Sequence, residues 1–303
     1  MTTTKSHNRN LLRRGIRAPA LARGLSIRLP SHRVLAVLMT LTLCATWVRG
    51  QSIGDALASA AVVLLAWALV RELDPDHTMP AQLSGGAVGA FELLHQHQHV
   101  DLMAVTVVLL CVRIMLASSG RAVTVVDVAL GAGAAWFAAD ARAGASAAAL
   151  LIVALLAHSL CSHRWRDRPK ESPLTMAAVL VATAAAGIGA VAIGWPLTEG
   201  IDPPRWIPVT VLGFLGALVL FIDRTPVASR CDSRDHTGDR APVTYRRARA
   251  SRMLFAVALV TVLLADGVGA ISATAPLWIA SGVAGMYALP RAARSRRYTV
   301  ADE

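Results

Sequence analysis

The sequence predicts an all-α fold: a polytopic integral membrane helical bundle with about ten transmembrane helices and with both termini in the cytoplasm. The chain has 303 residues, of which 55% are hydrophobic and 16% charged, whereas soluble globular domains carry about 25% charged residues. Charge-poor runs such as 173–195 provide the roughly 20 apolar residues that a membrane helix needs. Lys and Arg also gather in alternate loops, as the positive-inside rule expects.

The hydrophobic segments predict the organisation of the chain in order. Residues 1–32 form a basic cytoplasmic tail, 33–222 hold helices one to eight, 223–252 form a polar cytoplasmic linker, 253–290 hold the last two helices, and 291–303 form a second tail. The ten expected spans are 33–48, 52–70, 80–95, 100–117, 123–139, 143–161, 173–195, 205–222, 253–269 and 271–290.

Prolines and small residues predict local features of these helices. Pro80 suits the first turn of the third helix, with Thr78 or Asp76 as its N-cap. Pro276 lies inside the tenth segment and predicts a kink there. Small-residue pairs four apart give flat helix surfaces for close packing, and they occur at Gly85/Gly89 and Ser281/Gly285.

The distribution of basic residues decides whether the third segment spans. With the N-terminus inside, 27 of the 30 Lys and Arg residues fall in inner regions, and the other three are Arg49, Arg142 and Arg205. The segment 80–95 would be a helix of about 24 Å, shorter than a hydrocarbon core of about 30 Å. If it did not span, the basic loops 162–172 and 223–252 would face outward. We therefore expect it to span and the chain to lie in a bacterial inner membrane.

The net charge of +11 does not indicate a nucleic-acid partner, because the basic loops lack interleaved aromatic residues and any known binding motif. The expected partner is the lipid bilayer, with a small-molecule or ion substrate possible. There is no Gly-x-x-x-x-Gly-Lys-Ser/Thr loop, no Gly-x-Ser-x-Gly elbow and no His-Glu-x-x-His motif. The sequence therefore predicts no cofactor and gives no reason to expect ATP-driven transport by this chain alone.

Ionisable side chains cluster at the outer end of the third segment. On a continuous helix Glu92, His95 and His99 share one face, and His97 and Asp101 lie beside them. Imidazole and carboxylate groups suit a divalent metal, a proton relay or a cation path, but they also suit a polar helix end with a wet loop. The candidates for a cation or proton path, with no resident metal assigned, are Asp55, Glu92, His95, His99, Asp101 and Asp266.

The inner loop between the second and third segments holds a second acidic candidate, Asp74 and Asp76 around Pro75. Two carboxylates one residue apart suit Mg²⁺ on a lipid-linked diphosphate, and Asp127 or Asp223 could supply a further acid. The alternative is a compact turn in which Asp76 caps the next helix. Arg113 and Asp127 are expected to pair across the loop 118–122.

These patterns leave three hypotheses of function open, and whether the chain is an enzyme is undecided. The first is a secondary transporter or permease-like protein that handles a small cation or couples protons. The second is a membrane-embedded enzyme acting on a lipid-linked substrate at the cytoplasmic face. The third is a non-catalytic scaffold or assembly subunit in which all polar groups are structural. Residues in the membrane interior are costly to ionise and by default face a cavity or a partner.

Overall fold

The structure is a computed structural model of the whole chain. It describes residues 28–95, 100–116, 127, 129–134, 154, 207–223, 230–234, 240–243, 245–266 and 269–301. Within these ranges the protein is mainly helical, which confirms the predicted all-α class at that coarse level. The expected spans 143–161 and 173–195 lie outside the described residues, apart from a helical Ala154.

Four helices form the N-terminal part of the described chain: α2 (Pro30–Val48), α3 (Ile53–Leu73), α4 (Met79–Leu94) and α5 (Leu102–Leu116). The C-terminal part contains α9 (Ile207–Ile222), α10 (Tyr245–Asp266), the short α11 (Gly269–Ala273) and α12 (Ala275–Ala301). Between α9 and α10, β1 (Arg230–Arg234) pairs antiparallel with β2 (Arg240–Pro242). The sequence analysis expected only a polar linker there.

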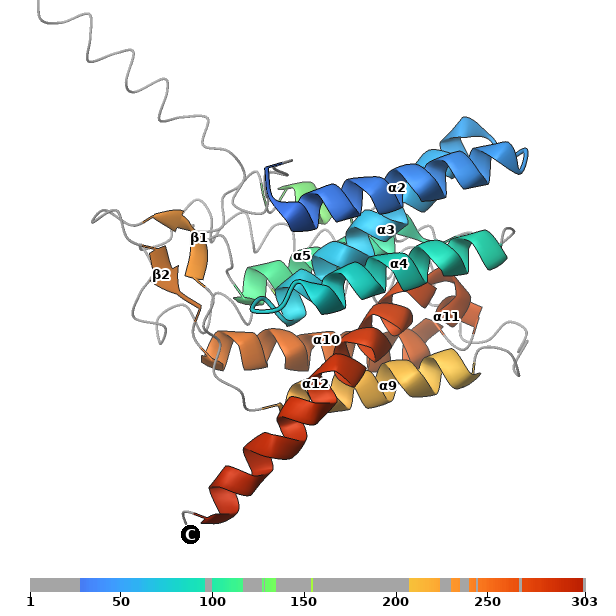
Figure 1. Cartoon of the computed structure of the whole chain (residues 1–303). Helices are drawn as coiled ribbons and strands as arrows, with labels where there is room; N and C mark the ends of the chain where they lie inside the picture. Colours follow the sequence, from blue (N-terminus) through green and yellow to red (C-terminus); the bar gives the residue numbers. More distant parts are fainter. Residues whose placement is uncertain are drawn as a thin grey trace, which may run out of the picture.

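The helices form two groups that pack against each other. In the first group α3 packs on α2, α4 and α5. In the second group α9 packs on both α12 and α10. Helix α12 also contacts α3 and α4, and α10 contacts α5, so the groups share one interface (Figure 1). The shared core includes Leu69, Val108, Leu259 and Trp278, all buried.

Successive helices run in opposite directions, so the bundle has two ends. One end, which we name the Asp74 end, carries the C-termini of α3 and α9 and the start of α10; it lies near the two strands at the left of Figure 1. The other, which we name the Asp101 end, carries the start of α5, where the backbone amide of Asp101 donates to Ala273 O at the end of α11.

Several helix ends differ from the expected ones for local physical reasons. Thr78 is the N-cap of α4, as expected, but its side chain makes no capping hydrogen bond. The expected kink at Pro276 is wrong: a break at Thr274 separates α11 from α12, and Pro276 lies in the first turn of α12. A proline fits there because the first-turn amides of a helix have no intrahelical partner. Pro290 instead lies inside α12.

Glycines allow α9 and α12 to approach backbone to backbone. A Cβ built on Gly216 would lie 2.1 Å from Ser281 O, and one on Gly285 would lie 2.1 Å from the Cα of Gly216. Ser281 Oγ also donates to Gly213 O at 2.8 Å. Trp278, fully buried, packs over Gly213 and against Phe214, with ring centroids 5.2 Å apart. The flat surface expected at Ser281/Gly285 is therefore the α9 contact of α12.

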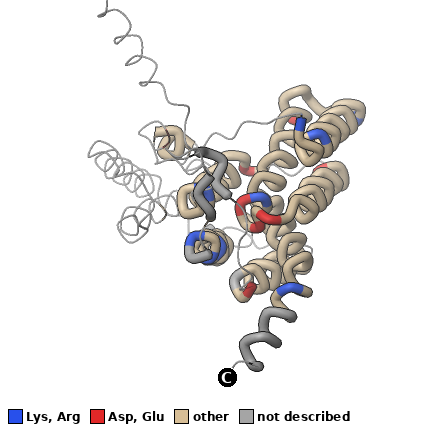
Figure 2. Tube along the Cα trace, turned by 60° about the vertical axis from the view of Figure 1, so that its left-hand side comes forward, with Lys and Arg blue, Asp and Glu red and all other residues tan. Residues whose placement is uncertain are grey.

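The outer surfaces of the bundle are apolar along whole helices. Exposed side chains follow helical spacing on α9 at Val211, Leu215 and Leu218, and on α10 at Met253, Val257 and Val260. Charges are sparse, and Figure 2 shows long uncharged stretches of helix. Among the described residues, two helices, α2 and α3, are long and apolar enough to cross a membrane, while Leu102–Leu116 and Pro208–Leu220 are apolar but shorter.

Candidate functional sites at the two ends of the bundle

At the Asp101 end, two predicted site residues lie in helix N-terminal turns: Ser52 caps α3 with Asp55 as its partner, and Asp101 itself caps α5. The Asp55 carboxylate accepts from Ser52 Oγ at 2.6 Å, while the Asp55 amide donates to Ser52 Oγ at 3.1 Å, so the pair closes the first turn of α3. Asp101 accepts from the amides of Met103 (3.0 Å) and Ala104 (2.9 Å) and so caps α5. A carboxylate is favourable at a helix N-terminus because it satisfies amides that lack intrahelical partners. Asp55 is exposed, whereas Asp101 is partly buried.

Glu92 differs from these two because it lies between helices. Its carboxylate is partly buried in the last turn of α4 and accepts a hydrogen bond of 3.2 Å from Ser59 Oγ of α3. Among the described residues no Lys or Arg pairs with it. His95 ends α4 and is exposed, with its ring stacked on Phe91 at a centroid distance of 4.5 Å.

The structure therefore brings Asp55, Glu92, His95 and Asp101 to the same end of the bundle. It joins none of the four to another by a hydrogen bond among the described contacts. His97 and His99 lie outside the described residues, and so does the side chain of Asp266, the last residue of α10. Among the described residues no group of three or more His, Cys, Asp or Glu side chains is arranged to hold a metal ion.

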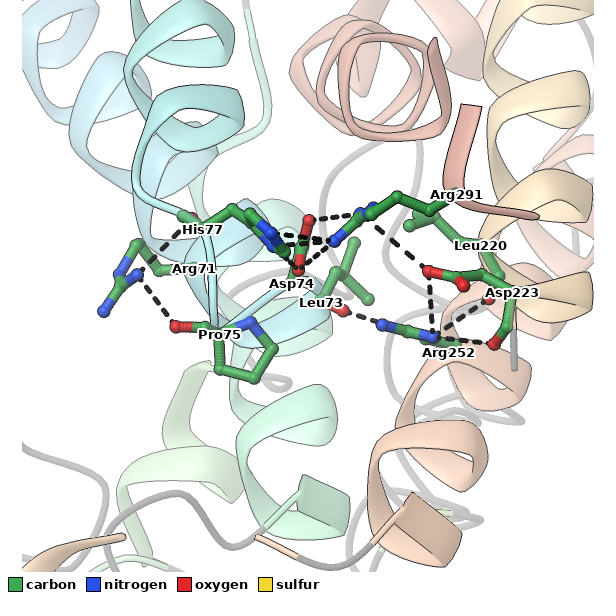
Figure 3. Close-up of polar contacts among 9 residues, drawn as sticks. All are labelled: Arg71, Leu73, Asp74, Pro75, His77, Leu220, Asp223, Arg252 and Arg291. Atoms are coloured by element: carbon green, nitrogen blue, oxygen red, sulfur yellow. Dashed lines mark hydrogen bonds and ion pairs between the residues drawn. The ribbon is translucent and has the colours of Figure 1, made fainter. Parts of the chain in front are cut away.

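The Asp74 end carries a buried ion cluster that joins the two helix groups (Figure 3). Asp74, the C-cap of α3, is 2% exposed and binds Arg291 of α12 through two hydrogen bonds, of 2.6 and 3.3 Å. Two parallel bonds between a guanidinium and a carboxylate form one of the stronger polar contacts in proteins. The same Asp74 carboxylate lies 2.9 Å from His77 Nδ1.

Arg291 also reaches a second carboxylate, because Asp223 Oδ2 at the end of α9 lies 3.8 Å from its Nη2. Burial lowers the pKa of the Arg291 guanidinium, but the hydrogen bond to Asp74 and the charges of Asp74 and Asp223 outweigh that effect. The pKa of Arg291 is therefore raised, and the side chain stays charged at every physiological pH.

Arg252 of α10 completes the cluster from the opposite side. Its Nε donates to Leu73 O (3.0 Å), and its Nη1 donates to Leu220 O (3.3 Å) and Asp223 O (3.2 Å). These carbonyls belong to the last turns of α3 and α9, whose C-terminal oxygens lack intrahelical donors. A cation is favourable there because it also complements the helix dipole. One buried guanidinium thus ties three helices together.

A further ion pair lies within the first helix group. Arg113 Nε of α5 donates to Glu72 Oε1 of α3 at 3.0 Å, and the Glu72 side chain is 1% exposed. Sequence reasoning expected Arg113 to pair with Asp127, which is buried; that pairing stays a prediction. Asp76 is partly buried beside the cluster.

Sequence reasoning missed Glu72, Arg252 and Arg291 as members of a site. It counted Arg291 as part of a cytoplasmic tail and Arg252 as part of a linker, because both follow or precede the expected apolar spans. A partial signal was present, since Asp223 was considered as a partner for Asp74. The structure places a guanidinium between those two carboxylates, so a cation bound by both would have to displace Arg291. Comparison with protein-family models, with curated proteins and with solved structures finds no match to this chain.

Proposed function

We propose that this chain is a multi-pass membrane protein of about ten spans in a bacterial inner membrane, and that it acts as a permease-like secondary transporter. It moves a small cation or couples transport to protons. The exposed apolar stripes of α9 and α10 support the membrane part of the proposal, because contiguous apolar surface of this extent is rare on soluble monomers. The Asp74 end then faces the cytoplasm.

Glu92 is the observation that carries the transport part. A carboxylate between two helices and near the hydrocarbon region is costly when charged. Its described partner is a serine hydroxyl, which can donate to the carboxylate and can equally accept from the protonated acid. Glu92 can therefore lose and regain a proton without breaking an ion pair, which is the property that a proton- or cation-coupled carrier needs.

The cluster at the Asp74 end fits the same proposal. Arg291 and Arg252 cross between the two helix groups at the end opposite to Glu92. Such links hold the groups together at the Asp74 end, which the proposal assigns to the cytoplasm. Alternating access in transporters works by rocking one helix group against another around a central site.

The test is ion exchange by the full-length protein in proteoliposomes. Vesicles containing a pH-sensitive dye are loaded at acidic pH and diluted into neutral buffer with Na⁺, K⁺, Mg²⁺ or Ca²⁺, or with a K⁺/valinomycin potential and no other cation. We expect the protein to dissipate the pH gradient faster than protein-free vesicles under at least one condition. Glu92→Gln is expected to reduce the rate to that of protein-free vesicles, because the amide cannot carry a proton.

Asp55→Asn is the matched control at the same end of the bundle. The amide oxygen of Asn can accept from Ser52 Oγ as the carboxylate does, and Asp55 is exposed, so this variant is expected to retain exchange. If the wild-type protein dissipates the gradient no faster than protein-free vesicles in every condition, the transport proposal is wrong. A scaffold or an enzyme on a lipid-linked substrate would then account for the membrane bundle.

A further inference from the structure

The loop that follows α3 holds His77 in a fixed position beside the ion cluster. Arg71 Nη1 donates to Pro75 O at 3.0 Å and to His77 O at 3.4 Å, so the turn is closed by a side chain of α3 itself (Figure 3). The His77 side chain is 35% exposed and packs against Tyr287 of α12, with ring centroids 5.6 Å apart. Protons from solvent can therefore reach a ring that is held in place.

The His77 ring lies between a carboxylate and a guanidinium. Nδ1 lies 2.9 Å from Asp74 Oδ1, whereas Arg291 Nη1 lies 2.6 Å from Nδ1 and 3.4 Å from Nε2. These two distances place Nη1 over the face of the ring, away from the in-plane lone pair of Nδ1. The carboxylate can only accept a hydrogen bond, so the neutral ring donates from Nδ1 to Asp74 while the guanidinium lies over its face. A proton added at Nε2 places a second positive charge directly beside Arg291.

We propose that His77 is a pH-sensitive switch that decides whether Arg291 remains bound to Asp74. In the neutral ring Nδ1 donates to Asp74, and the two-bond Asp74–Arg291 pair joins α3 to α12. When Nε2 takes a proton from solvent, the imidazolium still donates to Asp74 and repels the guanidinium beside it. This inference rests on the proposed function only in assigning the Asp74 end to the cytoplasm.

Every element that packs around His77 contributes charged or titratable groups. The loop and α3 contribute Asp74, Asp76 and Arg71, α12 contributes Arg291 and Tyr287, and the ends of α9 and α10 contribute Asp223 and Arg252. Arg71 and Arg291 oppose a charge on His77, whereas Asp74 favours it. Asp223 gives a released Arg291 another carboxylate to approach, since its Oδ2 lies only 3.8 Å from Nη2.

Release of Arg291 would loosen one of the polar links between the helix groups at the Asp74 end. Arg252 would still hold the carbonyls of α3 and α9, but α12 would lose its direct ion pair with α3. Histidine side chains in general change charge between about pH 5 and 8. Acidification is thus expected to free the C-terminal half of α12.

The experiment measures the distance between α4 and α12 as a function of pH. Spin labels are attached at the exposed positions Leu83 and Ala293 of the full-length protein in lipid nanodiscs, after replacement of its four native cysteines by alanine. Distance distributions are recorded between about pH 8 and pH 5, across the range in which histidine titrates. We expect a longer or broader distance population to grow on acidification, with a single-proton midpoint inside that range.

His77→Asn and His77→Lys separate the switch from general acid effects. Asn is neutral at every pH, and its amide can donate to Asp74 as Nδ1 does, so its distribution should stay in the high-pH form at both extremes. Lys, permanently charged, should show the low-pH form throughout. His32→Asn, at the same end of the bundle, should keep the wild-type response.

A wild-type distribution that does not change with pH would overturn the switch, as would an unchanged pH response in His77→Asn. The measurement needs no substrate and no flux. Failure of the switch is therefore distinguishable from failure of the transport proposal, which is judged by the Glu92 assay alone.

Discussion

Glu72 and Arg113 form a buried ion pair between α3 and α5, and the pair illustrates how charge behaves inside this bundle. Removing two charges from water is expensive, and their mutual attraction repays that cost only while both are present. The pair therefore specifies which helices meet more than it adds stability. The same reasoning applies to Asp74 and Arg291, where each charge is retained because the other is there.

We predict that Arg113→Met destabilises the protein, whereas the double variant Glu72→Met/Arg113→Met does not. The single variant removes the guanidinium that the buried Glu72 carboxylate accepts from and should destabilise the protein by about 3–5 kcal/mol. The double variant should be neutral or more stable than the wild type, since well-packed apolar residues often replace buried pairs without loss. Equilibrium unfolding in mixed micelles, followed by tryptophan fluorescence, measures both. Equal destabilisation by the two variants would show that the pair is itself a net source of stability.

Residues in this cluster were difficult to predict because their partners are distant in sequence. Arg291 and Asp74 are 217 positions apart, and neither hydrophobic periodicity nor charge counting relates them. Asp55 and Asp101 were identified as ionisable groups near helix ends, which they are, and their capping contacts are local. A single sequence therefore mainly indicates contacts between residues that are close together in the chain.

Helices α9 and α12 pack through glycines, and this contact determines how closely the second helix group assembles. Contacts between apolar helices gain most from close van der Waals packing when small residues let the backbones approach. A methyl group on Gly216 or Gly285 would meet backbone atoms of the facing helix. Backbone cannot rotate away as a side chain can, so the helices would have to separate.

Gly216→Ala should therefore destabilise the protein by about 1–3 kcal/mol, the usual cost of overpacking a tight contact. Gly86→Ala on α4 is the matched control, because a Cβ there meets nothing within 4 Å. Ala is the better helix former by about 0.5–1 kcal/mol, so this variant should be neutral or slightly stabilising. Thermal unfolding of both variants in detergent provides the comparison. A Gly216→Ala variant as stable as Gly86→Ala would mean that the α9–α12 contact is looser than described.

At the level of elements, apolar runs predicted the helices better than their ends. The expected spans 33–48, 52–70 and 205–222 each fall on a helix, because a long apolar run allows few other structures. By contrast, α10 begins at Tyr245 within a run of arginines, where hydropathy carries no signal. The strands β1 and β2 were missed for a related reason, since their residues are polar and charged.

For the whole molecule, alternation of helix direction is the main organising property. Arg71, Arg113, Arg252 and Arg291 come to the Asp74 end, whereas Asp55, Glu92 and Asp101 come to the other. Counting charges in loops predicted that these residues lie at opposite ends, while the sidedness of the two ends in a membrane stays a prediction. The assignment of the short segment 80–95 as a span was the least supported part of that prediction. In the structure this segment is α4, which runs antiparallel to both α3 and α5.

Sidedness of labelling at Gln98 and Ser233 tests the central claim, that the two ends of the bundle face opposite sides of a membrane. Each position is replaced by cysteine in a variant that lacks the four native cysteines, and intact cells are treated with a membrane-impermeant maleimide. We predict that the thiol at 98 is labelled from outside, and that the thiol at 233 is labelled only after the cells are permeabilised. Labelling of both positions from the same side would contradict the account.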